Sequence, residues 1–268
     1  AVLIIQQFCV LTGLPIINVS NYSPENPWKL NSLSSEPSHS SVYLAVLMYS
    51  FIITRESQIN HKYNLIKYFR ADYVVWLCFL WSMLSMKSAT AFIYLFFLIV
   101  KFVNKKNIIA VFIVFISFYS ISTTINSTAL SRVKKTAVAI LTLDTKAIID
   151  ADHSASYRIV PTLFAFKIID LETSDGWFGK GVDYMKDDLQ NQIPGTSEDP
   201  SIGSMFTFAV DYGIIPFIIF FIFSIRTCVD RKQFLSIVFL FFGVLLNSIN
   251  SQLLWFVIIF LYTNKNIV

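Results

Sequence analysis

Residues 202–225 read IGSMFTFAVDYGIIPFIIFFIFSI, and this stretch decides the fold class that the sequence predicts. Its only charged residue is Asp211. A helix of roughly 17–25 apolar residues is long enough to cross a bilayer. Further apolar runs without an interior Lys or Arg lie at 42–54, 71–86, 88–100, 108–125 and 234–262. The pattern predicts an all-α, multi-pass membrane protein.

The composition agrees with that class. Of the 268 residues, 55% are apolar and 14% are charged, whereas a typical globular domain has about 25% charged residues. The chain is therefore neither disordered nor an ordinary soluble protein. Its net charge of +4 is spread over many loops, which argues against nucleic-acid binding. The three cysteines form no CxxC or Cys/His pattern, so the sequence predicts no metal site and no cofactor.

Basic residues in the short connecting segments predict the orientation. Ten Lys and Arg residues gather at 55–70, 101–106 and 226–232. Under the positive-inside rule these three segments are cytoplasmic, which makes 71–100 a hairpin that turns around Lys87. The last run most simply forms a shallow hairpin with a polar turn at 247–252; a single tilted span is the alternative.

We expect one membrane domain with a large outer loop that contains helices. Its parts, in chain order, are the first part of the bundle at 1–125, the loop at 126–201 and the second part of the bundle at 202–268. In the loop, 131–149 is expected to be a helix with a basic start. A second helix is expected to begin near Ser156, with Pro161 in its first turn. Residues 1–17 look like the end of a helix that begins upstream, so the chain reads as a fragment.

Polar clusters on the outer side carry the candidate chemistry, because no nucleotide-binding, serine-hydrolase or zinc-protease motif is present. Glu36 precedes Pro37 at a helix start, where it is either a capping acid or an acid that faces a cavity. Lys87 lies in a turn, either as an interfacial lysine or as a cation for a phosphate.

The outer loop carries a second set of candidates. Arg158 has a planar fork suited to phosphate, although an ion pair with a nearby Asp or Glu is equally consistent with its position. His153 precedes it by five residues and is more simply a surface histidine. The glycines of 176–181 allow close backbone approach to a ligand, but a plain loop is the simpler interpretation. Asp211 is either paired with another helix or functional.

Taken in order, these clusters resemble the bacterial O-antigen polymerase (Wzy-type) and O-antigen ligase superfamily. The matching stretches are Ser35-Glu36-Pro37-Ser38, Ser85–Thr90, Ser154-Ala155-Ser156-Tyr157-Arg158, Phe178-Gly179-Lys180-Gly181 and Gly213-Ile214-Ile215. The resemblance covers nearly the whole chain, as the C-terminal two-thirds of a family member. Each motif is short, and the order of the motifs carries the specificity.

The resemblance implies a GT-C-like glycosyltransferase in the bacterial inner membrane, with its active site facing the periplasm. It would polymerise oligosaccharide units carried on undecaprenyl pyrophosphate into O-antigen or capsule, without a metal. The implied catalytic residues are Arg158, Glu36 and His153; the pyrophosphate would be bound by Arg158, Lys87, Arg132 and Lys135, and the glycan by Trp177, Gly179, Gly181 and Asp199. The expected partners are the lipid-linked glycan, membrane lipids, a chain-length regulator and a repeat-unit flippase.

Two alternatives remain at this stage. A ligase would transfer finished polymer to the lipid A core, but many ligases have a His-Asn pair where this chain has Glu198 and Asp199. A repeat-unit transporter would be expected to show inverted repeats and several charges within its spans. The sequence shows no repeat and only Asp211 as a clear charge within a predicted span.

Overall fold

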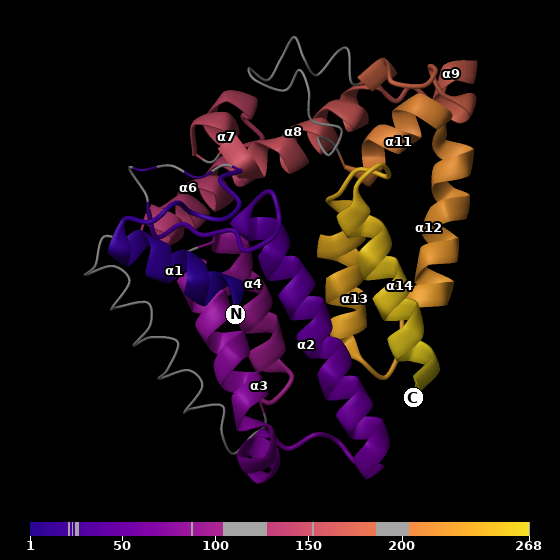
Figure 1. Cartoon of the computed structure of the whole chain (residues 1–268). Coiled ribbons are helices and arrows are strands. Elements are labelled where there is room, and N and C mark those ends of the chain that lie inside the picture. Colours follow the sequence, from indigo (N-terminus) through magenta and orange to yellow (C-terminus); the bar gives the residue numbers. More distant parts are fainter. Residues whose placement is uncertain are drawn as a thin grey trace. The chain divides into compact units, whose positions relative to one another are not determined.

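The computed structural model describes residues 1–20, 22, 24, 27–86, 88–103, 128–151, 153–185 and 204–267. Every regular element within these ranges is helical (Figure 1). The chain divides into two compact units. Unit 1 comprises Ala1–Ser131 with Ile267–Val268, and unit 2 comprises Arg132–Asn266.

The described part of unit 1 includes three helices that pack against one another in pairs, and a shorter N-terminal helix. The helices are α1 (Val2–Thr12), α2 (Pro37–Ile59), α3 (Leu65–Ser85) and α4 (Ala89–Val100). Helices α2, α3 and α4 lie side by side (Figure 1). Helix α3 ends at Ser85 and α4 begins at Ala89, so two helices meet where the sequence predicts the turn of a hairpin at 71–100, but neither has the length and apolarity of a membrane span.

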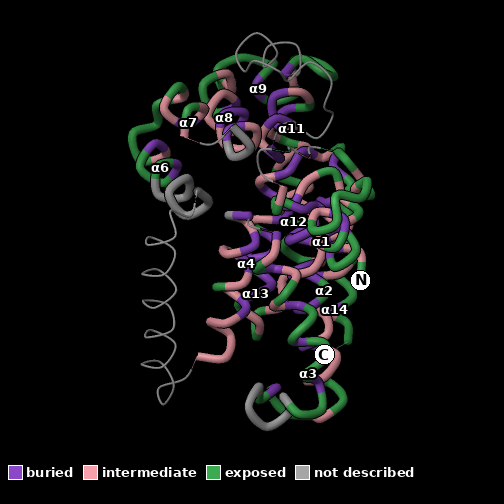
Figure 2. Tube along the Cα trace, turned by 60° about the vertical axis from the view of Figure 1, so that its left-hand side comes forward, coloured by how far each residue is buried: buried purple, intermediate pink, exposed green. Residues whose placement is uncertain are grey.

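The core of unit 1 follows one face of α2. The buried residues of α2 recur at intervals of three and four, which is the spacing of one side of a helix. They include Val42, Val46, Tyr49 and Ile53. Figure 2 marks the buried parts of the trace in purple. A smaller cluster of Leu3, Leu30 and Met86 anchors α1.

Unit 2 contains most of α6 (Thr128–Thr142) and the helices that follow it. These are α7 (Thr145–Ala151), α8 (His153–Ile168), α9 (Ser174–Phe178), α11 (Met205–Tyr212), α12 (Ile214–Cys228), α13 (Phe234–Leu240), the π-helical turn η1 (Phe241–Leu245) and α14 (Gln252–Ile267). A core of Ile148, Val160, Ala165, Met185 and Val210 joins α7, α8 and α11.

Two helix predictions in unit 2 need correction. The single helix predicted at 131–149 is two helices, because Leu143 has a left-handed φ of 52° and ends α6. Asp144 then starts α7, its Oδ1 accepting the Lys146 amide at 2.9 Å. Helix α8 begins at His153, so Pro161 lies inside the helix and not in its first turn. The ring of Pro161 is buried against the core, and this burial offsets the main-chain hydrogen bond that a proline cannot donate within a helix.

The predicted multi-pass membrane protein with a GT-C-like bundle is wrong, and so is the predicted inner-membrane localisation. In the described ranges, no helix combines the length and the apolarity needed to cross a bilayer. The run at 202–225 breaks at Gly213, and α12 has only 15 residues. The run at 234–262 is interrupted after Leu245, and α14 has 16 residues. The predicted run at 108–125 lies outside the described residues.

Candidate functional site

The segment after α9 binds to the C-terminal end of α11 through the main chain. The Lys180 amide donates to the Val210 carbonyl at 2.9 Å, and the Gly181 amide donates to the Asp211 carbonyl at 3.1 Å. The Phe-Gly-x-Gly stretch and the Gly-Ile-Ile stretch are thus neighbours in space, although about 30 residues separate them in the chain. Two motifs that the sequence analysis singled out separately belong to one structure.

Two glycines make this close contact possible. Gly179 has a φ of 90°, and a Cβ there would lie 2.2 Å from the Asp211 carbonyl oxygen. Gly213 has a φ of 97°, and a Cβ there would lie 2.1 Å from the Trp177 carbonyl oxygen. Each glycine therefore faces the main chain of the other segment, and neither position has room for a side chain.

Asp211 is held at this contact through its side chain as well. Its Oδ1 accepts the Met185 amide at 3.0 Å, and the carboxylate is half-buried at the C-terminal end of α11. Burial raises the pKa of Asp211 to about 6; the Met185 amide opposes this shift and the charge of Asp183 adds to it. This carboxyl group changes its charge near neutral pH.

Aromatic rings and one cation border the contact. Trp177 is 41% exposed, and its Nε1 donates to the Leu171 carbonyl at 2.9 Å, which fixes the indole ring. Tyr184 is also 41% exposed, and the Lys180 Nζ lies 5.0 Å from the centre of its ring. The exposed Tyr212 ring lies 4.7 Å from that of Phe208. Such rings offer flat apolar faces beside polar groups.

Arg158 lies on α8, which packs against α11. The buried residues Ser156 and Val160 anchor one face of α8, and Arg158 is two residues from each of them. Arg158 itself is partly exposed, and the buried Ala165 lies seven residues on, on the same side of α8. The helix backbone is rigidly supported where it carries this guanidinium.

The other predicted site residues have different outcomes. Lys135 is exposed on α6, and Arg132 belongs to the same helix. His153 is the first residue of α8. Lys87 and Asp199 lie outside the described residues. Of the predicted site residues, Trp177, Gly179 and Gly181 lie together at the contact that also holds Asp211.

Glu36 belongs to unit 1, whereas Arg158 belongs to unit 2. It is the N-cap of α2, and Pro37 follows in the first turn, as the sequence predicts. Its Oε2 accepts the Ser38 hydroxyl at 2.7 Å. Glu36 therefore stands at the helix start, but its carboxylate bonds the Ser38 hydroxyl and makes no side-chain cap hydrogen bond to the described main chain of α2.

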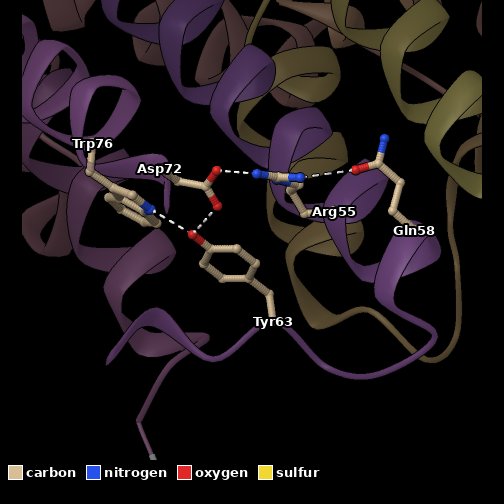
Figure 3. Close-up of polar contacts among 5 residues, drawn as sticks. All are labelled: Arg55, Gln58, Tyr63, Asp72 and Trp76. Atoms are coloured by element: carbon tan, nitrogen blue, oxygen red, sulfur yellow. Dashed lines mark hydrogen bonds and ion pairs between the residues drawn. The ribbon is translucent and has the colours of Figure 1, made fainter. Parts of the chain in front are cut away.

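A second ionisable cluster, which the sequence analysis missed, lies in unit 1. Figure 3 shows Asp72 of α3 between two partners: Arg55 of α2 forms an ion pair with Oδ1, and the Tyr63 hydroxyl donates to Oδ2 at 2.8 Å. The Trp76 Nε1 donates to the Tyr63 hydroxyl at 3.1 Å. In the sequence, Arg55 is interpreted as one of the basic residues that orient the chain in a membrane. Its ion pair with Asp72 joins residues 17 positions apart, and no local sequence pattern predicts such a pair.

The carboxylate of this second cluster is buried, whereas its Arg55 side chain is 36% exposed. Asp72 is only 4% exposed, and burial alone would raise its pKa, but hydrogen bonds from Arg55 and Tyr63 and the charge of Arg55 together lower it. Burial raises the pKa of Tyr63 to about 12. Both carboxylate oxygens are occupied, so the cluster joins α2, α3 and the segment between them.

Within the described ranges, no group of three or more His, Cys, Asp or Glu residues is placed to bind a metal ion. Comparisons of the chain with family models, with curated proteins and with solved structures give no match. The half-buried Asp211 at the contact between the two glycine segments, in the same unit as Arg158, is the best candidate site.

Proposed function

We propose that this chain is a glycosyltransferase that polymerises oligosaccharide units carried on undecaprenyl pyrophosphate, with Arg158 as the cation that binds the pyrophosphate. The observation that carries the proposal is the gathering of three motif stretches in unit 2. Helix α8, which contains Arg158, packs on α11, and the Phe-Gly-x-Gly segment binds the end of α11 beside Gly213.

The chemistry of Arg158 supports this role. A pyrophosphate attached to a lipid is a leaving group whose negative charge grows in the transition state, and a fixed cation stabilises that charge. An arginine keeps its charge at every physiological pH and can bind two phosphate oxygens at once. Val160 and Ala165 anchor α8 in the core, so its backbone is already ordered before the donor binds. Binding then does not cost the conformational entropy of ordering that helix.

The surroundings also suit a saccharide. Trp177 and Tyr184 expose aromatic rings in the same unit, and the indole ring of Trp177 is held by its hydrogen bond to Leu171. Flat aromatic faces pack well against the C–H faces of sugar rings, and a fixed ring loses little conformational freedom on binding.

The test is an assay with purified protein and a synthetic undecaprenyl-pyrophosphate-linked oligosaccharide, with the products separated by size. The wild-type protein is expected to produce a ladder of longer glycans. Arg158→Ala should lower the rate about 10²–10³-fold, since one stabilising contact to the developing charge is lost. Arg158→Lys should fall between the two, because it keeps the charge but not the planar fork.

The control is Lys167→Ala, which removes another cation from the same helix. Lys167 lies over the Phe164 ring near the end of α8. This variant should keep the wild-type rate within about threefold, since no phosphate contact is assigned to it. An Arg158→Ala protein that polymerises as fast as the Lys167→Ala control would contradict the proposal.

A further inference from the structure

We infer that Asp211 is the general base of this transfer, taking the proton from the hydroxyl group of the acceptor sugar. The inference rests on the function proposed above and assigns a role that the sequence resemblance left without a residue. Its evidence is the geometry of the contact between α11 and the 179–185 segment.

The first point is that Asp211 is positioned before any substrate arrives. Its carbonyl oxygen accepts the Gly181 amide and its Oδ1 accepts the Met185 amide, so one segment holds both its main chain and its side chain. Gly179 packs directly on the same carbonyl. A base that is already oriented avoids the loss of conformational freedom at the moment of reaction.

The second point is that one carboxylate oxygen remains available. Within the part of the chain that the structure describes, Oδ1 accepts the Met185 amide and no donor binds Oδ2. The neighbouring charges are those of Asp183, a carboxylate, and Lys180, whose ammonium group lies over Tyr184. Among the described ion pairs, none joins Lys180 to Asp211, and Asp183 is itself an anion. The available oxygen is the proton acceptor in this mechanism.

The third point is the proton affinity of the group. A general base works best when its pKa lies near the working pH. Burial raises the pKa of Asp211 to about 6, so the group is mostly ionised at pH 7 and still holds a proton well enough to accept one.

The chemical step balances without a metal or a further reactant. As the acceptor oxygen forms its bond to the anomeric carbon of the donor, its proton moves to Oδ2 of Asp211. The bond from the anomeric carbon to the pyrophosphate oxygen breaks, and its electron pair leaves with the undecaprenyl pyrophosphate. Asp211 then returns the proton to water.

The experiment compares Asp211→Asn with the wild type in the assay described above. An asparagine keeps an oxygen for the Met185 amide but cannot accept the proton, so the contact is preserved and the base is lost. We expect kcat to fall about 10²–10⁴-fold with KM changed less than threefold. The wild-type rate should decline below pH 6, whereas the residual rate of Asp211→Asn should lack this decline. Formate should partly restore the rate of Asp211→Ala.

The matched control is Asp183→Asn, which neutralises the neighbouring carboxylate. It should keep the wild-type rate at pH 7.5 and move the acidic decline to lower pH, because Asp183 raises the pKa of Asp211. Thermal unfolding followed by circular dichroism establishes that each variant is folded.

If the wild type polymerises and Arg158→Ala does not, yet Asp211→Asn keeps a third or more of the wild-type rate, the inference about Asp211 alone is overturned. A wild-type protein that transfers no glycan overturns the proposed function and this inference together.

Discussion

Asp72 in unit 1 and Asp211 in unit 2 are both withdrawn from water, but their surroundings differ. Asp72 meets a guanidinium and a phenol, and its pKa is lowered. Among the described residues, the Asp211 carboxylate accepts the Met185 amide and lies near the charge of Asp183, and burial raises its pKa to about 6. The difference shows that the partners of a buried carboxylate, more than burial itself, decide whether it stabilises a fold or remains available for chemistry.

The largest effect is expected from Asp72→Ala. It leaves the buried Tyr63 hydroxyl without its acceptor and removes the partner of the Arg55 guanidinium, which is 36% exposed and can be hydrated; the hydrogen bonds lost to the charged acceptor should together cost about 3–4 kcal/mol. Urea unfolding at pH 7 measures the loss. Because the folded pKa of Asp72 is below its usual value of 3.8, the wild type should keep this contribution above about pH 4 and lose it as the pH falls further. Equal stability of the two proteins at pH 7 would mean that the cluster is not formed.

The next largest loss of stability is expected from alanine substitutions at Gly179 and Gly181, which separate the cost of steric crowding from the cost of backbone conformation. Gly179 and Gly181 both have positive φ, but only Gly179 has neighbouring atoms where a Cβ would lie. Gly181→Ala should cost about 1–2 kcal/mol for the backbone conformation alone, and Gly179→Ala about 2 kcal/mol more for the displaced main chain. Similar free energies of unfolding for the two variants would indicate that the contact with Asp211 is loose.

A smaller loss is expected from Tyr63→Phe, which keeps the ring and removes only the hydroxyl. Asp72 then loses one donor and the Trp76 Nε1 loses its acceptor, while the Arg55 ion pair stays. We expect about 1–2 kcal/mol of destabilisation in urea unfolding. A loss as large as that of Asp72→Ala would show that the tyrosine, and not the arginine, is the main partner of Asp72.

The smallest effect has the opposite sign. Because the folded pKa of Asp211 is about 6 and its unfolded value about 3.8, the folded state loses stability as the pH rises from about 4 to 6 and stays lower above that range. Asp211→Asn avoids this loss and should be more stable than the wild type by about 1 kcal/mol at pH 7.5. The advantage should vanish near pH 4 in thermal unfolding. A destabilised Asn variant at pH 7.5 would indicate that Asp211 has a cationic partner.

The sequence predicts those parts of the fold that depend on neighbouring residues. The start of α2 at Pro37 and the interruption at 247–252 come from proline and polar residues whose effect is local. The break at Leu143 has no such signal, since a leucine with positive φ is rare. The sequence did not predict the break at Gly213 in the apolar run at 202–225, because a single glycine within such a run does not by itself indicate the end of a helix.

The candidate site was harder to predict than the helices. Asp211 stood out in the sequence as a lone charge, but Met185, the residue that holds it, is 26 positions away and binds through its main chain. A main-chain partner leaves no trace in residue type. The same holds for the glycines, whose need for space comes from the opposite segment.

The reciprocal contact of Gly179 and Gly213 has a consequence for double substitutions. A methyl group at either position must push the two segments apart, and that displacement makes room for a methyl group at the other. The second substitution should therefore cost less than the first, so that the pair shows epistasis and its combined penalty falls short of the sum of the two.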